Sequence, residues 1–450
     1  KVKYIYYNKY IYINMYDDIY FKKKRHVKNS KVRKSKNKVI KNTKSYIEKN
    51  GKNIYFLFSS ITFLQFFIPL VIEFNLLNYS CVFILRENLK RYCDPYDKHN
   101  YNMLLNFAKK YKIKLIKSSI EILNKITGPV IMIDGDIYGP PRDFELKNAG
   151  LFHLNKEKTI KFNLTEHLNF LVTYYYYINE IDYAIFTNKY LIDQVKTMSN
   201  NEEKLIEVAP NFFINTELTY DSEKNVYLGN PKFDNLLSNN EIYKKYKLNP
   251  NKKYCLFLYP KKIPPKQEDK NIFNNNHLKK ILLFLKKIGY TLIIKCRPKE
   301  RNYVRREVQK EILISKDSYP KETLELLKIS DLSVMCSSSA IDESVYTKTP
   351  CIDLETDLRN YTRNSYLLKD KLCMSLPLKK WKNMEFDEFK KFLENFVEKD
   401  SIEFVKLKNE FIFDWENSSK KIVNFIISKF EFFKNKTKLL DNCIESIIKE

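Results

Sequence analysis

The segment SSSAIDES (Ser337–Ser344), preceded by ISDLSVMC and followed by VYTKTPCIDL, decides the fold predicted for this chain. The apolar run Leu332–Cys336 predicts a strand, and Ala340–Tyr346 predicts a helix that begins directly after three serines. Pro350 ends that helix, and Cys351–Leu354 predicts a second short strand. Strand, serine turn, helix and strand in this order are typical of a parallel β-α-β unit.

The three serines support two interpretations. The first turn of a helix offers unpaired backbone N–H groups and the positive end of the dipole, which suits a phosphate held near Ser337, Ser338 and Ser339. The alternative is that Ser337 or Ser339 only caps the helix. The segment alone does not choose between them, so other parts of the chain must.

Short strands and helices alternate from residue 53 onwards, which is typical of parallel sheets covered on both faces. In the first half we expect strands at 54–58, 79–85, 113–116, 130–133 and 183–187, and helices at 63–75, 101–111, 120–126, 165–178 and 189–198. In the second half we expect strands at 254–259 and 291–295, and helices at 277–288, 323–330, 386–397 and 402–433, the last interrupted near 418–419.

The segment GNPKFD (Gly229–Asp234) marks a turn where the chain leaves one sheet for the next. We therefore expect a basic N-terminal extension at 1–50, α/β domains at 51–225 and 226–400, and a C-terminal helical segment at 401–450. Two sheets that meet at a polar seam predict a cleft, and such clefts are favoured ligand sites.

One segment resembles a membrane span. Residues 54–72 contain no charge, and 19 residues are enough to cross a bilayer. Ser59, Ser60, Gln65 and Pro69 interrupt the segment, however. A buried strand, a polar turn and a buried helix account for these residues better, and with no apparent signal peptide we expect a cytoplasmic protein, or a peripheral one at the cytoplasmic face of a membrane.

Charge favours anionic partners. The 450 residues include 80 Lys and Arg against 54 Asp and Glu, a formal net charge of +26. Residues 22–44 alone hold twelve Lys or Arg and no acid. Such an arm is either a disordered tail or a contact for nucleic acid or an anionic membrane.

The eight cysteines and five histidines show no zinc-type spacing, so we expect no protein-bound metal. Most of the cysteines fall inside apolar runs, which indicates reduced core residues.

Polar residues follow the strand expected at 130–133. Asp134 and Asp136, in DGDIYGPPR, lie where parallel sheets bind ligands, and they offer a base or a cation ligand. The alternative is that these residues only form a tight turn, because Asp, Gly and Pro are the residues that tight turns need. His153 and His167 are further candidates for a general base, although a single histidine is more often structural.

Three strands of the second half are each followed by polar groups: Pro260-Lys261-Lys262, then Arg297 with Lys299, then the serines. If these strands are neighbours, their ends converge and place cations beside hydroxyl and N–H groups. That combination would bind a diphosphate. The alternative for each of these three polar segments is that it only forms part of a charged, solvent-exposed edge of the sheet.

The chain resembles the GT-B superfamily of nucleotide-sugar enzymes over roughly residues 53–430. The resemblance rests on the two α/β halves together with three segments, GNPKFD, IIKCRPKE and SSSAIDESVYTKTPCIDL. The likeness is to the CDP-glycerol glycerophosphotransferase-like and the UDP-N-acetylglucosamine 2-epimerase-like proteins. The resemblance implies two Rossmann-like parallel-sheet domains that face a central cleft, the first on the acceptor side and the second binding the nucleotide.

The resemblance also assigns roles. A Lys-His-Pro-Lys type segment of the relatives matches Lys295–Lys299, where Arg297 replaces the histidine and keeps a cation toward phosphate. The relatives' phosphate-binding pair matches Ser338 and Ser339, and their ribose-binding Glu matches Glu343. Ser339, Ala340 and Ser344 depart from the epimerase pattern.

These assignments imply a transferase in glycan biosynthesis. It would move a sugar or alditol phosphate from a nucleotide-sugar or CDP-alditol donor, without a tightly bound cofactor, to a glycan, polyol-phosphate or lipid-linked acceptor. The alternatives are a UDP-sugar 2-epimerase, or a non-enzymatic nucleic-acid-binding protein with a degenerate fold of the same type.

Overall fold

The computed structural model describes about two thirds of the chain after residue 51, and the rest is not described. The described residues are 52–58, 61–85, 98–117, 120–133, 154–165, 181–187, 189, 192–193, 195–196, 205–209, 212–215, 220–260, 275–296, 304–305, 311–314, 321–336, 338, 340–354, 373–394 and 417–449.

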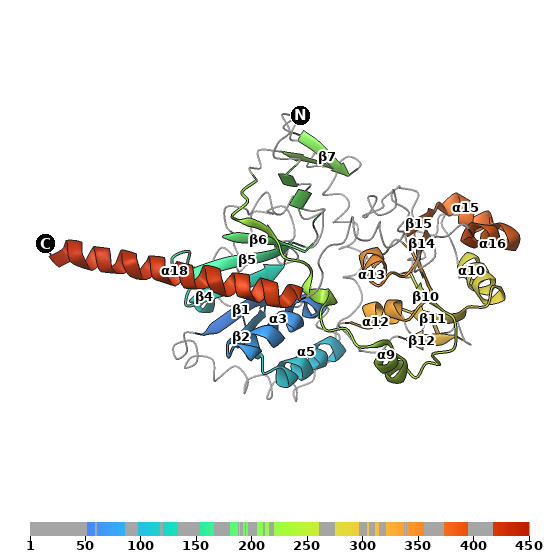
Figure 1. Ribbon diagram of the computed structural model, residues 1–450, viewed down its shortest axis with the longest axis horizontal. Coiled ribbons are helices and arrows are strands. Elements are labelled where there is room, and N and C mark those ends of the chain that lie inside the picture. The colour runs from blue at the N-terminus through green and yellow to red at the C-terminus, as the bar shows by residue number, and fades with distance from the viewer. Residues whose placement is uncertain are drawn as a thin grey trace, which may run out of the picture. The chain divides into compact units, whose positions relative to one another are not determined.

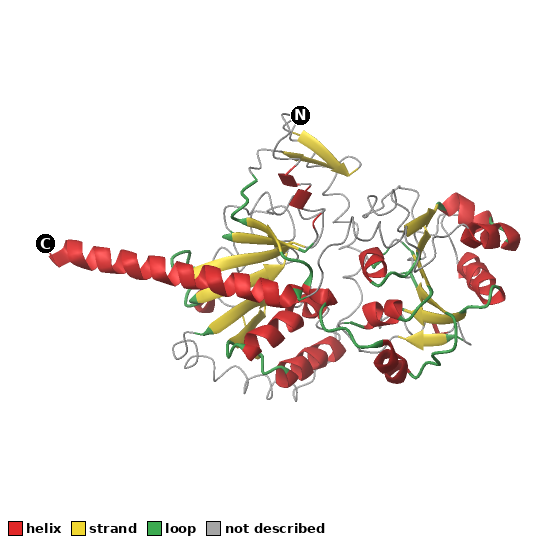
Figure 2. Ribbon diagram, in the orientation of Figure 1, coloured by secondary structure: helices red, strands yellow, loops and turns green. Residues whose placement is uncertain are grey.

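The first sheet has seven parallel strands in the order β3-β2-β1-β4-β5-β6-β9 (Figures 1 and 2). Its strands are β1 (Asn53–Phe58), β2 (Ser80–Leu85), β3 (Lys114–Lys117), β4 (Gly128–Ile133), β5 (Thr159–Thr165), β6 (Tyr183–Phe186) and β9 (Asn225–Tyr227).

The uncharged segment 54–72 forms β1 and then the turn η1 (Ile61–Phe63) and the helix α3 (Leu64–Leu76), which confirms the expected strand and helix. In β1, Phe56 and Phe58 face α3, whereas Tyr55 and Leu57 face the opposite side of the sheet. Every residue of β1 is buried, as a central parallel strand requires. Within the described residues, no helix combines the length and the apolar character needed to span a bilayer.

Two more helices share the α3 face of this sheet. They are α5 (Lys98–Lys110) and α18 (Ser418–Lys449), which lies beside α3 and packs Ile422, Ile426 and Phe430 into the same apolar cluster (Figure 1). The short helix α6 (Ile120–Leu123) packs Leu123 on the opposite face. Strands β7 (Leu205–Ala209) and β8 (Phe212–Asn215) form a separate antiparallel pair.

The second sheet has six parallel strands in the order β12-β11-β10-β13-β14-β15. They are β10 (Tyr254–Leu258), β11 (Thr291–Lys295), β12 (Ile312–Ile314), β13 (Leu332–Met335), β14 (Cys351–Leu354) and β15 (Cys373–Leu376).

Helices cover both faces of the second sheet. One face carries α10 (Asn275–Lys287), α15 (Leu378–Asn383) and α16 (Phe386–Glu394), which pack against Cys255 and Phe257 of β10. The other face carries α9 (Asn239–Tyr246), α12 (Glu322–Lys328) and α13 (Ile341–Tyr346), which pack against Tyr254 and Leu256. The predicted α/β class is therefore confirmed for both sheets.

Three observations add to or correct the sequence expectations. Residues 159–165 form β5, a strand that the sequence did not predict, and Thr165 ends this strand instead of beginning a helix. The last helix begins at Ser418 and continues to Lys449, beyond the expected end at residue 433. Six cysteines have side chains that the structure describes, and five of these are buried.

Candidate functional site

The strand order places the serine segment at the topological switch point of the second sheet. From β10 the chain adds β11 and β12 on one side, then returns to add β13, β14 and β15 on the other side. The switch therefore lies between β10 and β13, and ligands of such sheets bind beyond the carboxyl ends of these strands. The segment that leaves β13 there is SSSAIDES.

The three strands expected to converge are indeed neighbours, because β11, β10 and β13 are adjacent and parallel. Arg297 and Lys299 follow β11 in the chain, but they lie outside the described residues, as do Lys261 and Lys262 after β10. Lys295, the last residue of β11, forms an ion pair with Glu322 of α12, with 3.1 Å between Nζ and Oε2.

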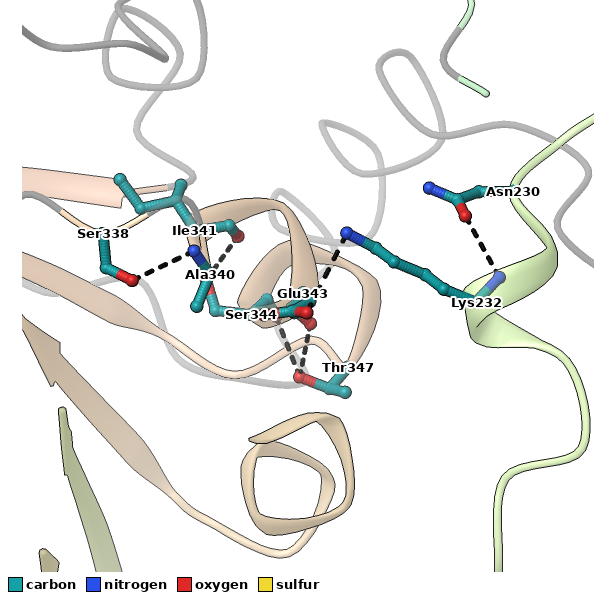
Figure 3. A network of polar contacts seen from close by, with 8 residues as sticks. All are labelled: Asn230, Lys232, Ser338, Ala340, Ile341, Glu343, Ser344 and Thr347. Atoms are coloured by element: carbon teal, nitrogen blue, oxygen red, sulfur yellow. Dashed lines mark hydrogen bonds and ion pairs between the residues drawn. The ribbon is translucent and has the colours of Figure 1, made fainter. Parts of the chain in front are cut away.

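Ser338 makes a local turn contact. Its Oγ accepts a hydrogen bond from the backbone N–H of Ala340 at 3.2 Å, just before α13 (Figure 3). Ser337 and Ser339 lie outside the described residues. The structure thus gives Ser338 a local bond to the residue two positions on, in the turn before α13. This is not the bond of a helix cap, because the N-cap residue is Ala340 and it has no side-chain capping bond.

Glu343 lies in the first turn of α13 and meets a cation from a distant part of the chain. Its Oε1 is 3.9 Å from Nζ of Lys232, and the two side chains are 14% and 6% exposed (Figure 3). A buried charge is unfavourable without an opposite charge nearby. This ion pair therefore explains why two ionisable side chains can lie where little solvent reaches them. The sequence predicted Glu343 but not its partner.

Lys232 belongs to the short helix η7 (Pro231–Phe233) inside GNPKFD. Asn230 caps this helix by accepting a hydrogen bond from the N–H of Lys232 at 3.1 Å. The ammonium of Lys232 lies 5.7 Å from the ring centre of Phe66 in α3 and 5.1 Å from that of Phe233. These distances are within the range of cation–π contacts, so Lys232 is held by aromatic faces as well as by Glu343.

The residues that follow Lys232 anchor η7 to other helices. The Phe233 ring stacks on Tyr346 of α13 at 4.1 Å between ring centres. The Asp234 carboxylate accepts hydrogen bonds from the N–H groups of Ser418 and Ser419, at 3.3 and 2.5 Å, and so caps α18. The sequence marked GNPKFD as a domain seam, and nothing in its spacing indicated these contacts.

Lys321, which precedes α12, donates a hydrogen bond to the backbone oxygen of Asp234. Burial lowers the pKa of the Lys321 ammonium to about 8, against the attraction of Asp234 and Glu325. Burial also raises the pKa of the Asp234 carboxyl, although the hydrogen bonds from Ser419 and Ser418 oppose this shift. A titratable pair therefore lies beside η7.

The first sheet has the same kind of switch point, between β1 and β4. Asp134 directly follows Ile133, the last residue of β4, in the chain. Asp134, Asp136, His153 and His167 all lie outside the described residues. Within the described ranges, no group of three or more His, Cys, Asp or Glu side chains is arranged to hold a metal ion.

Sequence comparison finds no matching family and no matching curated protein. Solved structures do match. A putative UDP-N-acetylglucosamine 2-epimerase from Listeria monocytogenes has a TM-score of 0.53 at 11% identity, covering 84% of this chain and 96% of its own. The wall teichoic acid polymerase TagF, as a variant soaked with CDPG, has a TM-score of 0.51 at 15% identity, covering 85% and 89%.

A third similar structure is S. aureus MnaA with UDP, which has a TM-score of 0.50 at 15% identity and covers 84% of this chain and 97% of its own. These matches, together with two parallel sheets of the same strand order, establish a GT-B-like fold. The resemblance noted in the sequence is thereby confirmed at the level of the fold.

Proposed function

We propose that the protein is a GT-B-like transferase that moves a sugar or alditol phosphate from a nucleotide-activated donor to an acceptor. The observation that carries this proposal is the position of SSSAIDES, which leaves β13 at the switch point of the second sheet. Ligands of doubly wound sheets bind at that point. The solved structures of similar fold include one with UDP and one soaked with CDPG, which supports a nucleotide as the ligand.

In this proposal each half has a task. Glu343 accepts hydrogen bonds from the ribose hydroxyls, and the donor diphosphate is held by Arg297, Lys299, Ser338 and Ser339. The candidates for orienting the acceptor or removing its proton are Asp134, Asp136, His153 and His167. Fixed cations and N–H groups that face the departing diphosphate stabilise the charge that develops on it. Ser337 belongs to the same phosphate-binding turn.

The second candidate is a UDP-sugar 2-epimerase. The TM-score of the Listeria monocytogenes structure is similar to that of TagF, so the fold favours neither reaction. Product analysis separates the two, because epimerisation proceeds without an acceptor and transfer does not. The departures at Ser339, Ala340 and Ser344 from the epimerase pattern place transfer first.

A thermal-shift panel of CDP, UDP, GDP and their sugar or glycerol conjugates tests nucleotide binding. A ligand that binds only the folded state raises the melting temperature, by an amount that grows with its concentration relative to Kd. We expect at least one nucleotide to do so. If none stabilises the folded protein while DNA or RNA binds in a salt-sensitive way, the nucleic-acid-binding alternative replaces the transferase.

Two variants test the position of the site. Ser338→Ala and Arg297→Ala are each expected to weaken the binding found in the panel. Ser238→Ala is the matched control, because the Ser238 hydroxyl also accepts a hydrogen bond from a backbone N–H, that of Glu241 at the start of α9. If Ser338 only stabilises its local turn, both serine variants lower the melting temperature and neither weakens nucleotide binding.

A further inference from the structure

The ion pair between Lys232 and Glu343 joins the two segments that the sequence analysis singled out, GNPKFD and SSSAIDES. The residues are 111 positions apart in the chain, and both belong to short helices, η7 and α13. Figure 3 shows the Lys232 side chain extended from η7 toward the Glu343 carboxylate. The pairing is thus a property of the tertiary fold and not of either segment alone.

Lys232 has little freedom to move. Its side chain is 6% exposed, its backbone is fixed by the Asn230 cap, and the next residue, Phe233, stacks on Tyr346 of α13. The Tyr346 hydroxyl also donates to the backbone oxygen of Phe233 at 3.4 Å. The helix that carries Glu343 and the helix that carries Lys232 are therefore connected at two points, which keeps the ammonium opposite the carboxylate.

The exposure of Lys232 limits its role. An ammonium packed between the rings of Phe66 and Phe233 and almost closed to solvent is poorly placed to contact a ligand directly. Glu343 is the more accessible member of the pair. A carboxylate has about four acceptor sites on its two oxygens, so an ammonium beside Oε1 is compatible with hydroxyl groups that donate to the same carboxylate.

We propose that Lys232 is a positioning residue, which holds the Glu343 carboxylate charged and correctly oriented to accept hydrogen bonds from the ribose 2′- and 3′-hydroxyls of the donor nucleotide. The inference rests on the proposed function, because it presumes that Glu343 faces a ribose. It adds that recognition of the ribose depends on a residue of GNPKFD, a segment with no assigned role in donor binding.

The test compares ribose with 2′,3′-dideoxyribose nucleotides. The probes are UDP, CDP and their 2′,3′-dideoxy forms, and the measured quantity is the ratio of the two Kd values for each base. In the wild-type protein we expect the dideoxy forms to bind about tenfold or more weakly, since hydrogen bonds to a charged group are lost. Glu343→Gln and Lys232→Met should each bring the ratio to within about threefold of one.

Two further variants separate positioning from general stability. Lys232→Arg keeps the cation and should retain at least part of the discrimination. Lys245→Met removes another lysine that pairs with a buried acid, Glu325, at 2.5 Å, but it does not touch Glu343. It should therefore leave the ratio unchanged. A purely structural role of Lys232 would lower the melting temperature in Lys232→Met without changing the ratio.

A measurement on the wild-type protein keeps the inference testable if Lys232→Met fails to fold. Amide hydrogen exchange in residues 230–234 should slow more with UDP or CDP than with the dideoxy form at equal occupancy, because only the ribose engages Glu343 and steadies its partner. Equal exchange rates in residues 230–234 with the ribose and the dideoxyribose nucleotide would overturn the inference.

The outcomes distinguish the two proposals. If no nucleotide binds the folded wild-type protein, the proposed function fails, and the inference fails with it. If nucleotides bind but ribose and dideoxyribose forms bind equally, or if Lys232→Met keeps the full wild-type ratio, the positioning role of Lys232 is wrong while nucleotide binding stands.

Discussion

The two sheets share a strand order but are stabilised differently. In the first sheet, aromatic rings of β1, β2 and α3 pack together, with Phe67 centred 4.9 Å from Phe56 and 5.7 Å from Phe83. In the second sheet, the helix α12 carries two buried acids, each paired with a lysine: Glu322 with Lys295 at 3.1 Å and Glu325 with Lys245 at 2.5 Å.

This difference predicts which substitutions affect stability most. Apolar packing stabilises without directional demands, whereas a buried ion pair contributes little net stability but requires a fixed geometry. The two ion pairs join α12 to β11 and to α9, on the face of the second sheet that also carries α13. We therefore expect truncation of a side chain to cost more stability in the aromatic cluster of the first sheet than in the ion pairs of the second.

The largest expected effect is in the aromatic cluster. Phe67→Ala removes a fully buried ring of α3 that packs against Phe56 of β1 and Phe83 of β2, and should lower the free energy of unfolding by about 3–5 kcal/mol. Leu76→Ala on the same helix is the control and should change it by less than about 0.5 kcal/mol, because that side chain is 71% exposed. Urea unfolding measures both, and similar values would contradict the account of the first sheet.

A smaller effect is expected at Glu325, which also accepts a hydrogen bond from the Tyr246 hydroxyl at 2.6 Å. Glu325→Leu should lower the free energy of unfolding by about 1–3 kcal/mol, because it leaves the Lys245 ammonium without this partner. The double variant Lys245→Met with Glu325→Leu should recover part of that loss, since a replaced ion pair is often neutral. A loss in the double variant equal to the sum of the losses in the two single variants would show that the charges do not interact.

A pH dependence of stability is expected at Lys321. Burial gives this side chain a pKa of about 8 in the folded protein, and the unfolded chain keeps the ordinary value of 10.5. Between these values the unfolded chain binds more protons, so the stability contributed by Lys321 rises with pH. The wild-type free energy of unfolding minus that of Lys321→Met should therefore increase from about pH 8 to pH 10.5. If this difference in the free energy of unfolding did not change with pH, the Lys321 ammonium would be exposed to water in the folded protein.

The sequence predicted those parts of the fold that have strong local signals. Apolar runs such as Tyr254–Leu258 and Thr291–Lys295 form strands as expected. Strand β5 has a weaker signal, because Ile160, Phe162 and Leu164 alternate with polar residues, a pattern typical of a half-exposed strand. Here all seven residues are buried, including Lys161 and Asn163, so the tertiary packing determined what the local pattern left open.

The candidate site shows the same limit. Ser338 became a candidate because it lies between a recognisable strand and a helix, and Glu343 because of the resemblance to the GT-B superfamily. Lys232 could not, because its distance from Glu343 depends on how η7 packs against α13 and α3. The adjacency of β11, β10 and β13 was a condition of the prediction, and the structure confirms it.

The most direct test of the central claim is amide hydrogen exchange of the full chain with and without saturating CDP or UDP. We expect the nucleotide that stabilises the protein to slow exchange in residues 337–347, after β13, and in residues 230–234. No comparable change is expected in residues 80–85 of β2. Protection confined to other segments, with residues 337–347 unchanged at full occupancy, would contradict the assignment of the donor site to the second sheet.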